Sequence, residues 1–421
     1  MSSFRFLHAA DLHIDSPLRG LEADTEAPAE QIRAATRTAF SNLIDLALRE
    51  QVAFVLIAGD LFDGEWPDWR TGQFLVQQTA RLKQADIPVF GIRGNHDAES
   101  IVTQRLPRDA LRWLRADAPE TIRLPDLAAC IHGQSFATRD IGDNLASNYP
   151  PPLPGHFNIG LLHTAATGRS GHASYAPCSV EQLAAHGYDY WALGHVHARE
   201  VLLREPCWIV FPGNTQGRHI GEAGPKGASV VTVQDGHVTA VEHRDLDAVR
   251  WALLEVPLDG AADMEAVAAG VRRRLDAAVT EAGDRLLAVR IVLTGACVAH
   301  NHLVRDLGKT RDALRTEAAA AGSAAIWIEG VQVRTRPALD VAAMRERSDA
   351  TGMLVRAIDD ADAADFAAVM QDYCSRLLGK AAGLRAALGA EHPAVLAAAG
   401  TVQPELLERA KNLLLARLAE R

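Results

Sequence analysis

The amino-acid sequence predicts an α/β fold, with a two-sheet αββα sandwich in residues 1–245. Two observations support this prediction. Apolar runs typical of buried strands alternate with helical patterns through this stretch, and shorter strand patterns separated by Gly and Asp turns follow Gly194. The expected helices are 28–50, 71–86 and 179–187. We expect four further strands, at 201–203, 207–211, 228–234 and 237–243. They would form a meander that completes the second sheet, with Asp235-Gly236 as a hairpin turn.

Five of the apolar runs are each followed by a short polar cluster. The runs are 4–9, 52–58, 87–92, 157–162 and 188–193. The clusters are Asp11-Leu12-His13, Gly59-Asp60-Leu61-Phe62-Asp63, Gly94-Asn95-His96-Asp97, His163, and Gly194-His195-Val196-His197. Because α/β sheets place their functional groups beyond the carboxyl ends of their strands, we expect these clusters to meet in one site.

The residue types in the clusters suit a catalytic metal site. Carboxylate oxygen, amide oxygen and imidazole nitrogen, without any thiolate, fit Mn²⁺, Fe²⁺, Zn²⁺ or Mg²⁺ better than a structural Zn²⁺. Two such ions about 3.5–4 Å apart can hold one phosphate and activate a water, which predicts phosphoester hydrolysis. Any one of these motifs alone is more often turn chemistry, but turns have no structural reason to repeat this inventory at five strand ends.

The motifs DLH, GDLFD, GNHD, LLHT and GHVH together resemble the calcineurin-like metallophosphoesterases. Within them, four longer segments resemble the YhaO family, which is similar to the SbcD nuclease subunits. These segments are HAADLHIDSPLRGL (8–21), YAPCSV (175–180), YDYWALGHVH (188–197) and PGNTQGRH (212–219). The resemblance is specific over about residues 4–245. It implies a DNA repair exonuclease that uses two divalent metal ions, and we expect these ions to be Mn²⁺.

The resemblance also implies a role for each site residue. The first metal would be held by Asp11, His13, Asp60 and His197, and the second by Asp60, Asn95, His163 and His195, so that Asp60 bridges them. His96 would donate a proton to the leaving oxygen, and Asp63 would orient His96. Some nucleases of this branch carry a histidine at the position of Asp63, so the substrate contact of that histidine does not transfer to this chain. Asp97 is expected to be a turn or helix-cap residue.

Four other histidines lie outside the five clusters, and we expect different roles for them. His8 and His132 lie inside apolar runs, so packing is the expected role for both. His172 and His219 flank the ligand loops in Gly-rich segments and are weaker candidates for contacting substrate.

Length and composition limit the remaining choices. A chain of 421 residues should form two or three domains. Five dispersed cysteines without a C-x-x-C pair argue for reduced thiols, and neither a signal peptide nor a membrane-spanning run is evident, so a cytoplasmic protein without membrane contact is expected. The net charge of −10 is unusual for a DNA-binding protein, but two divalent ions would add positive charge where a phosphate binds.

One arginine pattern could supplement that positive charge. A helix that begins near Pro107 would align Arg105, Arg108, Arg112 and Arg115 on one face. A solvated face is favoured over a ridge that contacts phosphates.

Two further regions follow the catalytic domain. Residues 246–345 show a β-α-β-α-β order over 251–256, 261–279, 285–294, 302–321 and 325–334, which by resemblance is a small α+β capping domain. Residues 346–421 are helical, with two apolar stripes. The stripes are Phe366, Val369, Met370, Tyr373 and Leu377, and Leu406, Ala410, Leu413, Leu414 and Leu418. Packing within the chain is favoured for the stripes, but the resemblance implies an SMC-like ATPase partner that such helices could bind. A homodimer is left open.

The sequence therefore predicts a two-metal DNA phosphodiesterase, an exonuclease acting with an ATPase. A phosphodiesterase or phosphatase for small nucleotides or phosphoproteins would use the same ligands and is the first alternative. A non-catalytic scaffold with a structural metal site is the second, and the intact His96 argues against it because a structural site needs no proton donor.

Overall fold

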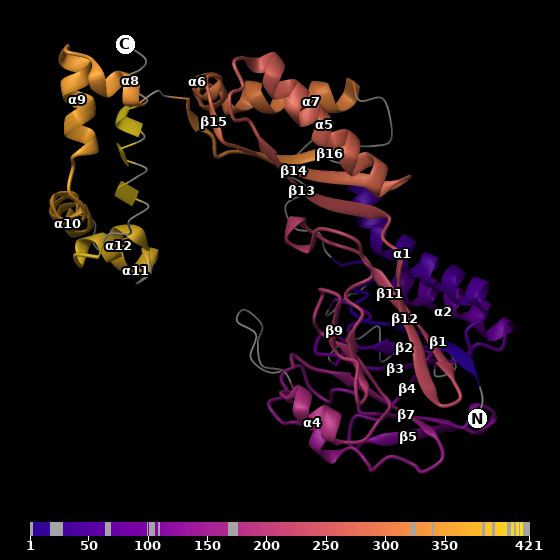
Figure 1. The fold of residues 1–421 in the computed structure, drawn as a ribbon. Coiled ribbons are helices and arrows are strands. Elements are labelled where there is room, and N and C mark those ends of the chain that lie inside the picture. Colours follow the sequence, from indigo (N-terminus) through magenta and orange to yellow (C-terminus); the bar gives the residue numbers. More distant parts are fainter. Residues whose placement is uncertain are drawn as a thin grey trace. The chain divides into compact units, whose positions relative to one another are not determined.

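The computed structural model in Figure 1 describes most of the chain. The described residues are 3–16, 28–63, 69–98, 100, 106–107, 110–166, 176–320, 326–338, 341–380, 384–389, 392–401, 406–407, 410–411 and 413–415. The chain divides into two compact units. The first comprises Met1–Leu253, Asp276–Arg290 and Gly322–Glu329, and the second comprises Leu254–Leu275, Ile291–Ala321 and Gly330–Arg421.

Two six-stranded sheets form the centre of the first unit. One has the order β12 (His237–Asp245), β11 (Gly227–Gln234), β1 (Phe4–Ala9), β2 (Phe54–Ala58), β3 (Val89–Ile92) and β4 (Arg112–Trp113). The other has the order β5 (Glu120–Leu124), β6 (Ala129–Gly133), β7 (Phe157–His163), β8 (Tyr190–Gly194), β10 (Trp208–Phe211) and β9 (Glu200–Leu203). The strands β1, β2 and β3 are parallel, as are β6, β7, β8 and β10, so the strand ends that carry the polar clusters share one edge of each sheet.

Apolar side chains alternate along these strands and build a layered sandwich. One face of the first sheet packs against α1 (Ala29–Glu50) and α2 (Trp69–Gln84), as Figure 1 shows. The other face packs against the second sheet, with stacked Phe6 and Phe54 opposite strands β7 and β8. The far face of the second sheet is covered by α4 (Val180–Ala185) and neighbouring loops. The predicted αββα sandwich is therefore confirmed.

Two details of the prediction are wrong. The β11–β12 hairpin, which turns at Asp235-Gly236 as predicted, does not complete the second sheet; β11 instead pairs antiparallel with β1 in the first sheet. The predicted helix after Pro107 does not extend to Arg112, which lies in β4, and Arg115 pairs with Asp117 in a loop. Arg105 and Arg108 lie outside the described residues.

The β-α-β-α-β order predicted after the sandwich is confirmed. It is formed by β13 (Val249–Pro257), α5 (Met264–Ala282), β14 (Leu286–Thr294), α6 (His300–Arg305), α7 (Leu307–Ala320) and β16 (Ile326–Val333). The second predicted helix is split because Asp306 interrupts it and accepts a hydrogen bond from Lys309 N at the start of α7. The strands form a sheet of order β13-β14-β16, and β15 (Ala296–Cys297) pairs with β17 (Arg336–Pro337). Domain boundaries at 245/246 and 345/346 stay predictions.

The described part of the C-terminal region is helical, as predicted. Its elements are α8 (Val341–Glu346), α9 (Ala350–Asp359), α10 (Ala363–Lys380), α11 (Leu384–Leu388) and α12 (Pro393–Ala398). Although α10 packs against α12, its Val369, Tyr373 and Leu377 are exposed. In the second apolar stripe Leu413 and Leu414 are exposed, and Leu418 lies outside the described residues.

Two composition-based expectations can be compared with the structure. All five cysteines are buried and unpaired, as expected for reduced thiols. Among the described helices, none combines the length and the apolar character needed to span a membrane.

Candidate metal centre

The loop after β1 lies directly beside the loop after β2. Asp11 N donates a hydrogen bond to Gly59 O (3.0 Å), and His13 N donates to Asp60 O (3.1 Å). Asp11, His13 and Asp60 all adopt left-handed φ angles, of 52°, 44° and 52°, and all three are buried. Left-handed backbone is unfavourable for residues with a side chain, so its repetition here marks a site where function overrides local preference.

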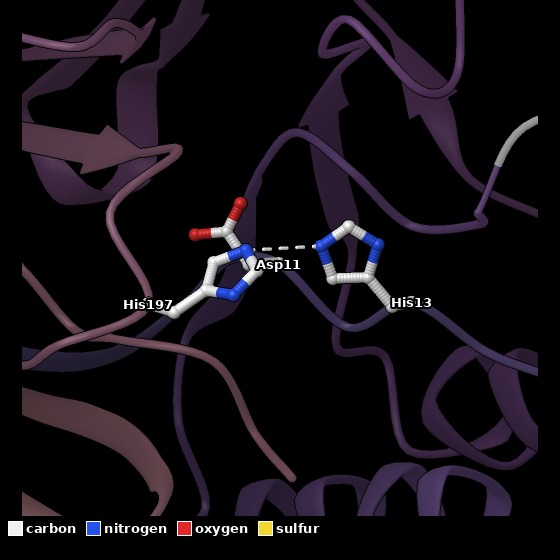
Figure 2. Close-up of side chains that lie close together, drawn as sticks. All are labelled: Asp11, His13 and His197. Atoms are coloured by element: carbon white, nitrogen blue, oxygen red, sulfur yellow. Dashed lines mark hydrogen bonds between the residues drawn. The ribbon is translucent and has the colours of Figure 1, made fainter. Parts of the chain in front are cut away.

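Asp11, His13 and His197 form the first group of converging ligand atoms, with one atom from each residue within 4.8 Å of the others. The two imidazoles face one another, with His13 Nε2 3.2 Å from His197 Nε2 and the Asp11 carboxylate beside them (Figure 2). His197 Nδ1 lies 2.7 Å from Glu222 Oε1 and donates to it, which leaves His197 Nε2 on the side of the ring that faces His13. Burial, followed by the charges of Arg218 and His197, holds the pKa of His13 well below its usual value. Two imidazole nitrogens beside a buried carboxylate form a donor set that fits a divalent cation.

Asp60, His163 and His195 form the second group, again within 4.8 Å. His163 Nδ1 lies 2.8 Å from Ala58 O, and its Nε2 lies 3.0 Å from Asn95 Oδ1 and 3.5 Å from Asp60 Oδ2. Burial lowers the pKa of His163, but Asp60 more than offsets this and raises it to about 9. A proton on Nε2 therefore occupies the position at which the oxygens of Asp60 and Asn95 converge, and a cation bound there would replace it.

The Asp60 carboxylate lies between the two groups. Its Oδ2 is 3.5 Å from His163 Nε2 and 4.0 Å from His13 Nε2. Its Oδ1 accepts the backbone N–H of His96 at 2.9 Å. Burial raises the pKa of Asp60, but the surrounding histidines outweigh it and hold the pKa far below its usual value. An ionised carboxylate in this position can bridge two cations.

Two glycines of the motifs are required by close approach. A Cβ atom at Gly94 would lie 2.3 Å from Asp60 Oδ1 and 2.8 Å from His163 Cε1. A Cβ atom at Gly59, which has φ +93°, would lie 2.4 Å from His163 Nδ1. The glycine that precedes Asp60 and the one that precedes Asn95 thus leave room for His163.

His96 lies at the partly exposed side of the centre. Its Nδ1 is 2.8 Å from Asp63 Oδ1, and its ring centroid is 5.1 Å from that of His13. Burial lowers the pKa of His96, but Asp63 and then Asp60 outweigh it and raise the pKa. Ser16 Oγ donates to the other oxygen of Asp63 at 2.6 Å. His96 is therefore held by a carboxylate and biased toward its protonated form beside the metal groups.

The structure brings together all nine residues predicted for the site. Comparisons with known proteins identify the domains of the chain. Residues 4–199 match the calcineurin-like phosphoesterase family, and residues 251–336 match the middle domain of metallophosphoesterase YhaO. Residues 4–199 therefore form a calcineurin-like metallophosphoesterase domain. This family uses a dinuclear metal centre, for which the two ligand groups are the candidates.

Three relatives show how far the similarity extends. The chain is 35% identical to the uncharacterized metallophosphoesterase YhaO of Bacillus subtilis over 281 residues, which cover 63% of this chain and 66% of the relative. It is 26% identical to the DNA double-strand break repair protein Mre11 of Sulfurisphaera tokodaii over 48% of this chain and 51% of the relative. The DNA double-strand break repair protein Mre11 of Aeropyrum pernix is also 26% identical, over 64% of this chain and 68% of the relative. The first two matches span less than two thirds of the relatives' own length.

Asp97 has a wider structural role than the predicted local turn. Its fully buried carboxylate accepts backbone N–H groups from Leu61 (2.9 Å), Phe62 (3.0 Å) and Gly94 (3.3 Å). Burial and then the charge of Asp60 raise its pKa to about 7. Asp97 thereby ties the loop of Asp60 and Asp63 to the loop of Asn95 and His96.

Sequence reasoning missed two residues behind the metallophosphoesterase centre. Glu222 accepts a hydrogen bond from His197 Nδ1, and the Arg218 side chain lies between the carboxylates of Glu222 and Asp63. Both follow β10 in a stretch without a strand-end motif, and the only signal was the likeness of 212–219 to the YhaO family.

The remaining histidines mostly match their expectations. His8 is buried between Tyr190 and Leu193 O, and His132 between Thr121 and Asn158, which confirms packing for both. His219 is exposed and accepts a hydrogen bond from the backbone of its own turn. His172 lies outside the described residues.

Proposed function

We propose that this metallophosphoesterase is a two-metal-dependent DNA phosphodiesterase, an exonuclease that acts in DNA repair with an SMC-like ATPase. The observation that carries the proposal is the position of Asp60 Oδ2 between two groups of converging ligand atoms, with His96 beside them. A DNA repair role fits the cytoplasmic location expected from the sequence.

The proposed ligand assignment follows the two groups. Asp11, His13 and His197 would hold one ion, and Asn95, His163 and His195 the other, with Asp60 shared. When bound, two divalent ions supply Lewis acidity for the phosphate and a water of lowered pKa. Mn²⁺ is the proposed metal, and Fe²⁺, Zn²⁺ and Mg²⁺ suit the same oxygen and nitrogen ligands.

His96 and Asp63 would manage the leaving-group proton. Because Asp63 holds His96 Nδ1 and raises the pKa of the ring, Nε2 is the nitrogen from which a proton can pass to the leaving oxygen. A sugar alkoxide is a poor leaving group, so this proton transfer would matter for a nucleic-acid substrate. The same pair is unnecessary in a scaffold whose metals only stabilise the fold.

The proposal of DNA as substrate draws on the relatives. Two of them are DNA double-strand break repair proteins, and the middle domain shared with YhaO goes beyond a minimal phosphoesterase. Exposed Tyr373 and Leu377 on α10, together with exposed Leu413, support an ATPase partner that covers apolar side chains.

The function is tested by incubating the full chain with Mn²⁺ and four substrates. These are end-labelled duplex DNA, end-labelled single-stranded DNA, a nitrophenyl phosphodiester and a nitrophenyl phosphomonoester. Shortening of labelled DNA from an end, abolished by EDTA and restored by Mn²⁺, is expected. Cleavage of the monoester alone would support a phosphatase, and no cleavage by a metal-loaded chain would support a scaffold.

The partner is tested on the same preparation. Tyr373→Glu combined with Leu413→Glu should abolish co-purification with the cognate SMC-like ATPase while nitrophenyl diester hydrolysis and the melting temperature remain unchanged. Undiminished co-purification would refute binding through these side chains.

A further inference from the structure

The carboxylates that orient His96 and His197 are joined by one side chain. Asp63 lies 2.8 Å from His96 Nδ1, and Glu222 lies 2.7 Å from His197 Nδ1. Asp63 follows β2, whereas Glu222 ends the 3₁₀ turn η4 (Ile220–Glu222), far away in sequence. Arg218 Nη1 lies 3.5 Å from Asp63 Oδ2, and Arg218 Nη2 donates to Glu222 Oε1 at 3.2 Å.

The surroundings of Arg218 hold it in this position. Its backbone N–H donates to Glu222 Oε2 at 2.8 Å, and its Nη1 also donates to Ser16 Oγ, which itself donates to Asp63. Only 17% of the side chain is exposed. Glu222 is further held by Asn214 Nδ2 at 3.0 Å. A guanidinium whose nitrogens already contact two carboxylates inside the protein is poorly placed to bind substrate, so its role is toward the centre itself.

We propose that Arg218 is a positioning residue that couples the proton donor to a metal ligand, by fixing the Asp63 and Glu222 carboxylates relative to each other. This proposal rests on the proposed function, because it takes His96 as the proton donor and His197 as a ligand. The planar fork of arginine sets the spacing of two carboxylates at once, which the single ammonium of lysine cannot do. A change at Glu222 should therefore reach His96, although Glu222 contacts His197.

A double-mutant cycle on metal affinity tests the coupling without any need for activity. Mn²⁺ dissociation constants are measured by titration calorimetry for Asp63→Asn, Glu222→Gln and the double variant, first with Arg218 and then with Arg218→Gln. When Arg218 is present, the change in the Mn²⁺ dissociation constant of the double variant should differ roughly fivefold or more from the product of the two single changes. When Arg218 is replaced by glutamine, the two single changes should simply multiply. Arg218→Gln alone should weaken one Mn²⁺ site by about 10–100-fold, the range for groups that orient metal ligands. An additive cycle in the presence of Arg218 overturns the proposal.

The leaving group gives a second readout that a merely structural role would not move. Glu222→Gln should slow cleavage of DNA about tenfold more than cleavage of a nitrophenyl diester, because only the sugar alkoxide needs the proton from His96. Compared with Arg218→Gln, Arg218→Lys should restore the melting temperature. It should not restore both the Mn²⁺ affinity and the ratio of DNA cleavage to nitrophenyl diester cleavage. Arg123→Gln, an exposed arginine on β5, removes the same charge and should change neither. Full rescue by lysine, or equal slowing of both substrates by Glu222→Gln, overturns the coupling.

The two proposals fail in different ways. A parent chain that binds two Mn²⁺ ions but cleaves no phosphoester refutes the proposed function, while the affinity cycle still decides the role of Arg218. A parent chain that cleaves DNA but gives an additive cycle refutes the coupling alone.

Discussion

Replacing Asp97 by asparagine should destabilise the two loops that carry Asp60, Asp63, Asn95 and His96. One carboxylate oxygen accepts from Leu61 N and Gly94 N, and the other accepts from Phe62 N. Asparagine keeps one acceptor oxygen but places an NH₂ group against the remaining N–H. One backbone donor then loses its partner in a fully buried position, and the new amide hydrogens have none.

The magnitude follows from the cost of unsatisfied buried groups. Each one costs about 1–3 kcal/mol, so Asp97→Asn should lower the free energy of unfolding by about 2–4 kcal/mol. For a unit of this size about 2–4 °C of melting temperature corresponds to each kcal/mol, so the melting temperature should fall by about 5–15 °C. Because the two loops also carry Asp60 and Asn95, Mn²⁺ affinity should fall in parallel.

Thermal unfolding followed by circular dichroism, in EDTA and again in Mn²⁺, measures both effects. Asp126→Asn, which neutralises an exposed carboxylate in the 3₁₀ turn η2 (Pro125–Leu127), is the matched control and should leave the melting temperature within about 1 °C. If Asp97→Asn melts at the control temperature in EDTA, the three backbone hydrogen bonds do not stabilise the loops as argued.

Three other predictions concern the centre and the core beneath it. Asp60→Ala removes the shared carboxylate and should leave fewer than two metals by elemental analysis with almost no activity; two retained metals with normal turnover would refute the bridging role. His96→Ala should keep both metals and lose about 10²–10⁴-fold in rate, with a larger loss on DNA than on a nitrophenyl diester, and equal losses would indicate a positioning role instead. His8, whose pKa burial lowers to about 3, binds a proton only after unfolding between that value and 6.5, so stability should fall as pH falls through this window. Between pH 7.5 and pH 5.5, the free energy of unfolding measured in urea should fall by about 1.4 kcal/mol more for the parent chain than for His8→Gln. Equal decreases in the two proteins would contradict a buried neutral imidazole.

The sequence by itself determined the chemistry of the centre. The proposed ligand side chains follow directly after buried strands, and strands are recognisable from short apolar runs. The strand-end position of Asp11, Asp60 and His163 was therefore readable without coordinates. The glycines of the motifs were readable too, although their reason, the space taken by His163, was not.

Strand pairing was decided by the tertiary structure. The β11–β12 hairpin has a local turn signal, but its partner β1 lies more than 200 residues earlier in the chain, and periodicity carries no information about that choice. In the same way, pairing with β3 makes Arg112 part of β4, where local spacing suggested a helix.

The supporting residues also depended on the tertiary structure. Glu222 and Arg218 are ordinary charged residues of a loop, and they acquire a role only because folding brings that loop against His197 and Asp63. Asp97 was visible as a turn residue, yet its second attachment, to the loop after β2, requires two segments 36 residues apart to meet. Ligands are specified by their own chemistry and are therefore legible in sequence, whereas the groups that orient them are specified by neighbours that only the folded chain supplies.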